Sequence, residues 1–160
     1  QYDTQLSGRI AASVASNYTK LDLDKWDIIY TIIVDATVIE GPSAGATMAI
    51  SVIAALENKT VNKSVAMTGT INEFGAIGPA GGIKEKASVA KANGITTFLV
   101  AVNQSYETSV KSETECRDIN GTNYCEVKRK ETKIEIAKEL GMNIIEVRSI
   151  DEAARYFFVE

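Results

Sequence analysis

Hydrophobic and polar positions along this chain follow two different periods, and each period predicts a different element. In residues 4–18 the apolar side chains recur at spacings of three and four residues, which predicts an amphipathic helix. Residues 43–56 are a run of alanine, methionine, isoleucine and valine with little polar interruption, which is typical of a helix buried on most sides. Residues 26–38 are instead rich in β-branched and aromatic side chains and predict one or two strands.

The rest of the chain continues this alternation of strands and helices. Further strands are predicted at 65–70, 97–102 and 143–147, and a glycine-rich return at 75–82 is predicted to be a hairpin arm. Further helices are predicted at 83–93, at 133–140 and from a Ser149/Glu152 capping box through Phe158. Residues 103–130 are polar and charged, and we expect them to be the least regular part. The pattern predicts a mixed α/β (α+β) fold in a single domain over residues 1–160.

Composition narrows the class of protein. The net charge of −4 with 24% charged residues gives no electrostatic footprint for nucleic acid, so no nucleic-acid partner is expected. No apolar run reaches the length of a membrane span. Because the sequence begins abruptly at Gln1, we expect it to be a piece of a longer chain.

Two cysteines and five glycosylation sequons bear on the cellular setting. Cys116 and Cys125 flank a Gly/Asn-rich turn, a spacing that suits either a disulfide across a hairpin or two free thiols. Asn-x-Ser/Thr sequons begin at Asn17, Asn58, Asn62, Asn103 and Asn120. Sequons and cysteines together slightly favour an extracytoplasmic or membrane-anchored location over the cytoplasm, although Asn, Ser and Thr also gather in ordinary loops.

The best nucleophile candidate is Ser43, which lies on a Gly/Pro turn directly before a helix. Gly41 and Gly45 permit unusual backbone geometry and Pro42 fixes one dihedral angle, so the turn is stiff. The alternative role for Ser43 is an N-cap of the following helix. Asp35 and Glu40 are the acidic residues near this turn, as supporting site residues or as solvated loop carboxylates.

The chain contains no histidine, so an activated serine needs another base. In the helix predicted at 83–93, Lys86 shares a face with apolar residues, whereas Lys84 lies on another face. Desolvation there disfavours the ammonium form and suits Lys86 to act as a general base. The alternative is a lysine whose stem covers apolar surface while its head group reaches water.

Three segments together resemble the proteolytic domain of the Lon protease family. Glu40–Gly45 is similar to that family's block around its catalytic serine, Ala66–Gly69 to its Met-Thr-Gly strand, and Gly81–Lys86 to its Gly-Gly-hydrophobic-Lys-Glu-Lys block. The resemblance spans about residues 4–102 and resumes in the closing helix-strand-helix. The cysteine-bearing excursion and the turn at Asn72–Gly75 depart from it, which marks a divergent member.

The resemblance implies a serine endopeptidase that uses a Ser-Lys dyad. Ser43 would be the nucleophile, Lys86 the general base, and Thr68 would orient the lysine amine. It also implies a polypeptide substrate and assembly as a homo-oligomer, a hexameric ring. No Walker A pattern occurs here, so we expect no cofactor in this domain, and ATP only if an ATPase domain exists elsewhere in the full chain. Two rival functions stay open: a catalytically silent ring-forming scaffold, and a phosphate- or nucleotide-binding module of related fold.

Overall fold

The computed structural model of the chain describes residues 2–33 and 41–158. Its helices are α1 (Tyr2–Thr19), the 3₁₀ turn η1 (Leu23–Lys25), α2 (Gly45–Leu56), α3 (Ile83–Ala92), α4 (Ile136–Leu140) and α5 (Ile150–Phe157). Its strands are β1 (Val65–Met67), β2 (Thr70–Ile71), β3 (Ile77–Gly78), β4 (Thr97–Ala101), β5 (Tyr106–Ile119), β6 (Thr122–Glu135) and β7 (Asn143–Val147). No helix in these ranges is long and apolar enough to cross a bilayer.

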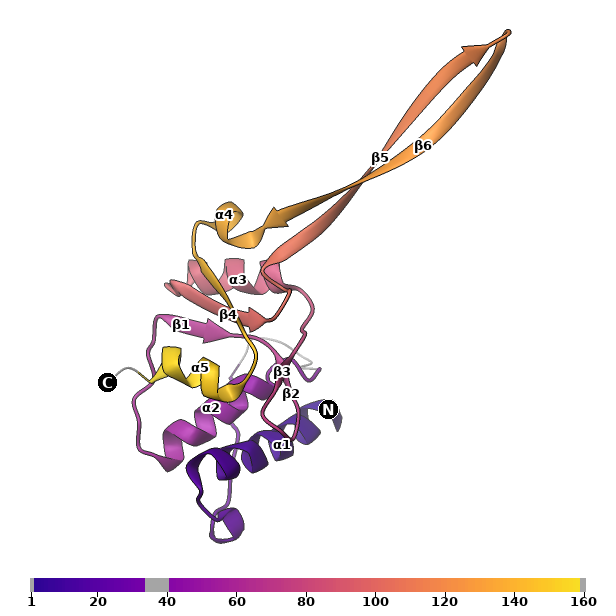
Figure 1. Ribbon diagram of the computed structural model, residues 1–160. Helices are drawn as coiled ribbons and strands as arrows, with labels where there is room; N and C mark the ends of the chain where they lie inside the picture. The colour runs from indigo at the N-terminus through magenta and orange to yellow at the C-terminus, as the bar shows by residue number, and fades with distance from the viewer. Residues whose placement is uncertain (1, 34–40, 159–160) are drawn as a thin grey trace.

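A three-stranded parallel sheet lies at the centre, in the order β1-β4-β7, with helices on both faces (Figure 1). Side chains alternate across the middle strand, as they must in a pleated sheet. Leu99 and Ala101 pack into the core formed with α1, α2 and α5, whereas Phe98 and Val100 pack against α3 and α4. Because both faces are covered, β4 is almost wholly apolar. The predicted mixed α/β (α+β) fold is confirmed.

Most predicted elements form near their predicted bounds. The Ser149 hydroxyl caps α5 by accepting from the Glu152 amide at 3.3 Å, while the Glu152 carboxylate accepts from the Arg148 amide at 2.9 Å. The strand predicted at 65–70 is divided in two. The Thr68 amide still donates to the Leu99 carbonyl of β4 at 3.1 Å, but the next amide, of Gly69, donates to the Ser43 carbonyl instead. β2 then pairs with β3 as the predicted hairpin.

The strands predicted at 26–38 are wrong for the described part of that segment, because residues 26–33 contain no strand. Ile29 and Ile33 are 85% and 92% exposed. β-Branched residues favour an extended backbone locally, but a strand also requires a hydrogen-bonded neighbour, and no described segment pairs with this one. Residues 34–38 lie outside the described part of the chain.

The prediction that residues 103–130 are irregular is also wrong. β5 and β6 pair over fourteen registered positions in an antiparallel ribbon that projects from the domain (Figure 1). Asn120 and Gly121, both at positive φ, close it with a two-residue turn that suits the twist of a hairpin. The ladder continues through Glu135, so α4 begins at Ile136 rather than near the predicted residue 133.

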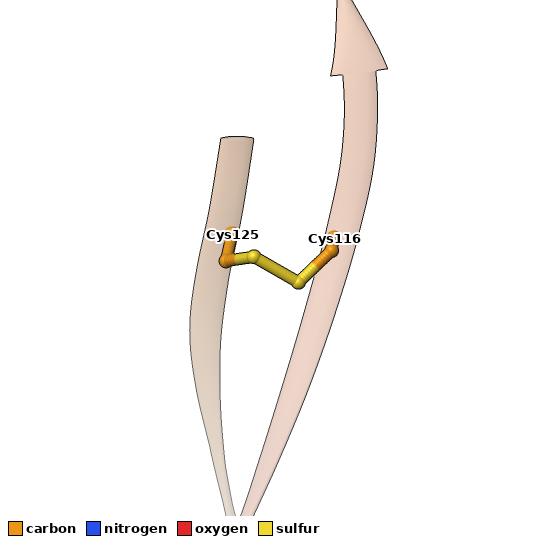
Figure 2. The surroundings of a disulfide bond; sticks show 2 residues. All are labelled: Cys116 and Cys125. Carbon is orange, nitrogen blue, oxygen red and sulfur yellow. A yellow bond between two sulfur atoms is a disulfide. The ribbon is translucent and has the colours of Figure 1, made fainter. Parts of the chain in front are cut away.

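Cys116 and Cys125 occupy opposite register positions in this ribbon and are joined by a disulfide (Figure 2). Of the two states that the sequence left open, the structure has the bonded one, because the hairpin register brings the two residues face to face. The bond is three register positions from the Ile119–Thr122 pair that flanks the turn, and thus near the tip of a ribbon that projects from the domain (Figure 1).

Candidate active site

Ser43 lies in the turn that leads into α2, where a helix cap would be expected. The helix begins at Gly45, its N-cap is Ala44, and no side chain caps it. The capping role considered for Ser43 therefore does not hold. Gly41 adopts a φ of +94°, a conformation that glycine tolerates and other residues rarely adopt, which explains the glycine at this point of the turn.

Backbone hydrogen bonds fix the turn to the segment after β1. The Ser43 carbonyl accepts from the Gly69 amide at 2.9 Å, and the Gly69 carbonyl accepts from the Ala46 amide at 3.2 Å. Gly69 has no room for a side chain, because a Cβ there would lie 2.6 Å from Cγ2 of Ile77. The serine is thus held by main-chain contacts that depend on a glycine 26 positions further along the chain.

Lys86 approaches this serine from α3. The Lys86 amide donates to the Gly82 carbonyl at 3.0 Å in the first turn of the helix. Its side-chain Nζ lies 3.1 Å from Ser43 Oγ and 3.4 Å from Thr68 Oγ1. Both Ser43 and Lys86 are partly buried, whereas Thr68 is buried. The hydroxyl groups of Ser43 and Thr68, from two different segments, therefore both contact the Lys86 amine of α3.

The Thr68 hydroxyl links the two partners of the site. It donates to the Ser43 carbonyl at 3.2 Å, so its own proton is used there. Its oxygen remains able to accept a hydrogen bond from the Lys86 amine. The hydrogen bond to Thr68 fixes how the Lys86 amine is oriented. In this orientation, Nζ also lies within hydrogen-bond distance of Ser43 Oγ.

The two lysines of this helix have different environments. Lys84 pairs with Glu139 at 2.6 Å and Glu107 at 3.5 Å, and the hydrogen bond and charge of Glu139 raise the pKa of Lys84 above its ordinary value. Lys84 consequently remains a cation. Lys86 has hydroxyl partners and, within residues 2–33 and 41–158, no ion pair with a carboxylate. A lysine without an anionic partner is the better candidate for a base.

The structure does not bring every proposed site residue together. Asp35 and Glu40 lie outside the described residues. Cys116 and Cys125 are on β5 and β6, the projecting ribbon that extends away from α2 (Figure 1). The described site thus consists of Ser43, Lys86 and Thr68.

Sequence reasoning missed a clamp on the segment that leads into α3. The Gln104 side chain accepts from the Ala80 amide at 2.9 Å and donates to the Ala80 carbonyl at 2.7 Å. Ala80 is followed by Gly81 and by Gly82, which has a φ of +65°, so the clamp fixes one end of a pliable glycine pair. A glutamine in the loop between β4 and β5 gives no local signal for such a contact.

A carboxylate on β7 holds the loop that carries Gln104. Glu146 Oε1 accepts from the Ser105 amide at 3.1 Å. Burial opposes ionisation of this carboxyl group, but hydrogen bonds from the Ser105 side chain and from the amides of residues 103–105 outweigh it and lower the pKa of Glu146. Glu146 was not anticipated either, because its partner loop is 41 positions away in sequence.

Comparison with known proteins places this chain in a family. Residues 7–115 match the family model described as the Lon protease (S16) C-terminal proteolytic domain. The chain is 44% identical over 77 residues to Lon protease of Buchnera aphidicola subsp. Acyrthosiphon pisum, a match covering 48% of this chain and 10% of that protein. It is 42% identical over 76 residues to Lon protease 1 of Bacillus subtilis, covering 48% and 10% of the two chains.

A longer match is found with Lon protease of Flavobacterium johnsoniae, 39% identical over 106 residues, which covers 62% of this chain and 13% of that protein. In each case the chain matches only about a tenth of the relative's length.

Proposed function

Because this chain belongs to the Lon protease family of C-terminal proteolytic domains, we propose that it is a serine-type endopeptidase with Ser43 as nucleophile and Lys86 as general base. The observation that carries the proposal is the 3.1 Å separation of Lys86 Nζ and Ser43 Oγ, which is within reach for direct proton transfer. The substrate class is polypeptide, by analogy with relatives named as proteases.

Acylation follows from this geometry. The neutral Lys86 amine takes the hydroxyl proton as Ser43 Oγ attacks the carbonyl carbon of a peptide bond. When the C–N bond breaks, the Lys86 ammonium returns that proton to the departing amine. The acyl group is then an ester of Ser43. Thr68 acts as a positioning residue, because its oxygen keeps the amine aimed at Oγ during both transfers.

Deacylation reverses the roles. A water molecule gives its proton to Lys86 and attacks the ester, and the lysine reprotonates Ser43 Oγ as the acid product leaves. The negative charge on the tetrahedral intermediate needs amide donors, each typically worth ~3 kcal/mol. The Gly45 amide already donates to the Pro42 carbonyl at 3.0 Å, whereas the Ser43 and Ala44 amides have no acceptor within residues 2–33 and 41–158 and are the candidate donors in this turn.

The site's contacts bear on both rival functions. Of the amides that a phosphate-binding helix N-terminus would use, those of Gly45 and Ala46 at the start of α2 already donate to carbonyls of the chain. A silent scaffold has no need to hold a serine and a lysine at hydrogen-bond distance through three elements, as here.

The test is hydrolysis of an unfolded protein such as casein and of short fluorogenic peptides by four proteins: wild type, Ser43→Ala, Lys86→Met and Lys84→Met. Loss of either dyad member is expected to lower kcat by roughly 10³-fold or more, as for nucleophile and base knockouts in other serine hydrolases.

Lys84→Met is the matched control, since it makes the same chemical change two residues away in the same helix. It is expected to retain activity within about threefold, because an exposed ion pair contributes little. Cleavage by Ser43→Ala at the wild-type rate would refute the proposal, and equal loss in both lysine variants would remove Lys86 from the mechanism.

A further inference from the structure

Five of the nine asparagines in this chain open an Asn-x-Ser/Thr sequon, where random placement gives about one or two. We propose that the domain is N-glycosylated, with an oligosaccharide joined to the side-chain nitrogen of these asparagines. The proposal is independent of the peptidase chemistry, since none of the five residues belongs to the site around Ser43.

The first argument is accessibility. Asn17, Asn58, Asn103 and Asn120 are exposed, and Asn62 is partly exposed. Asn58, Asn103 and Asn120 also have positive φ values, of 53°, 65° and 56°, which puts them where the backbone reverses direction and the side chain projects outward. Asn120 is in the turn that closes the ribbon, far from the packed domain (Figure 1).

The second argument is that the nitrogen that would carry the sugar is uncommitted. In residues 2–33 and 41–158, none of the five sequon asparagines donates a hydrogen bond through Nδ2; Asn62 and Asn103 use only Oδ1, as acceptors. Asn93, which opens no sequon, donates through Nδ2 to the Val89 carbonyl at 2.8 Å. A glycan on any of the five would therefore replace no hydrogen bond donated by the asparagine side chain.

The third argument is the disulfide, which is independent of the sequons. Cys116 and Cys125 are bonded on an exposed ribbon, where a reducing compartment would keep them as thiols. Sequons are glycosylated in the same oxidising compartments in which such bonds persist. Both features thus indicate one setting, an extracytoplasmic face of the cell.

The chemistry requires a lipid-linked oligosaccharide as the donor and a membrane-bound transferase. A bond forms between asparagine Nδ2 and the anomeric carbon of the first sugar, the bond from that carbon to the lipid phosphate breaks, and the phosphate leaves with its electron pair. The amide loses one proton to the transferase. The hydroxyl at the third sequon position is needed for recognition, which gives the test its control.

The experiment is peptide mass spectrometry of the protein purified from the cells that produce it. Peptides containing Asn58 and Asn120 are expected to carry added hexose or N-acetylhexosamine masses on asparagine, with lower occupancy at the partly buried Asn62. Asn72, Asn93 and Asn143 open no sequon and are expected at unmodified mass. Recovery of all five sequon peptides at unmodified mass would overturn the proposal.

Two variants at Thr60 test whether the sequon directs the sugar. Thr60 is exposed, so neither Thr60→Ala nor Thr60→Ser should disturb folding. Produced in the same cells, Thr60→Ala should lose the sugar on Asn58 completely, and Thr60→Ser should keep it. Persistence of the added mass in Thr60→Ala would show attachment unrelated to the sequon and would equally overturn the inference.

Discussion

Replacing Thr68 with valine removes one oxygen from the site at almost constant volume. The structure assigns that oxygen two contacts, a donated hydrogen bond to the Ser43 carbonyl at 3.2 Å and an accepted one from the Lys86 amine at 3.4 Å. In the variant the Ser43 carbonyl still accepts the hydrogen bond from the Gly69 amide at 2.9 Å. The free energy of unfolding should therefore fall by only about 0.5–1.5 kcal/mol.

The effect on catalysis is expected to be larger than the effect on stability. A hydrogen bond involving a group that becomes charged is worth about 1.5–3 kcal/mol, and in the proposed mechanism Lys86 becomes an ammonium ion in the transition state. At 1.36 kcal/mol per factor of ten, kcat for peptide hydrolysis should fall roughly 10- to 100-fold. KM should stay nearly constant, because Thr68 is only 5% exposed and its hydroxyl faces the lysine and the serine.

The assay is steady-state hydrolysis of a fluorogenic peptide, together with the rate at which a fluorophosphonate labels Ser43. Thr68→Ser restores the hydroxyl and should recover kcat to within about threefold of wild type, which separates the oxygen from the change in packing. The reasoning is refuted if Thr68→Val keeps wild-type kcat, or if Thr68→Ser is as slow as Thr68→Val.

Three further perturbations test the surroundings of the site. In Gln104→Glu the side chain can still accept a hydrogen bond from the Ala80 amide but cannot donate one to the Ala80 carbonyl. The segment that leads into α3 and Lys86 is then held less firmly, so kcat should fall about 3- to 10-fold at neutral pH. The ratio of variant to wild-type kcat should then rise in acid, where the carboxyl group is protonated; a ratio that does not change with pH would contradict the clamp. Gly69→Ala should lower the free energy of unfolding by about 1–3 kcal/mol in denaturant titration, while Gly81→Ala, which meets no atom within 4 Å, should be neutral. Glu146 has a lowered pKa, so its stabilising contribution is present above the ordinary carboxyl value of 4.5 and disappears as the pH falls through the folded-state value. The thermal midpoint of wild type should therefore fall more steeply below about pH 4.5 than that of Glu146→Gln, and parallel curves would contradict this assignment.

Much of the fold could be read from local patterns, because the relevant signals are periodic or chemically distinctive. The helix before the Ser43 turn, the buried helix after it and the capped helix at the end all formed near their predicted bounds. Prediction failed where a strand forms only if it finds a hydrogen-bonded neighbouring strand. Residues 26–33 have every local preference for a strand and no partner among the described residues, whereas residues 106–135 have polar strands that pair with each other along their full length.

The candidate site shows the same division. Residue types and spacing were enough to nominate Ser43 and Lys86, because a chain without histidine leaves few bases and the helical period separates Lys86 from Lys84. Thr68 was named only through the family resemblance. Gln104 and Glu146 could not be nominated, since each is an ordinary polar residue whose role exists only through a contact with a distant segment.

The amino-acid sequence by itself determined the alternation of helices and strands, the reactive groups available and the family to which the chain belongs, because each of these depends on residue identity and short-range spacing. Only the tertiary structure decided which hydroxyl meets which amine, whether the two cysteines bond and which strands pair. The contacts of Lys86 with Thr68 and Ser43, for example, join residues 18 and 43 positions apart, and such contacts are set by packing of the whole domain.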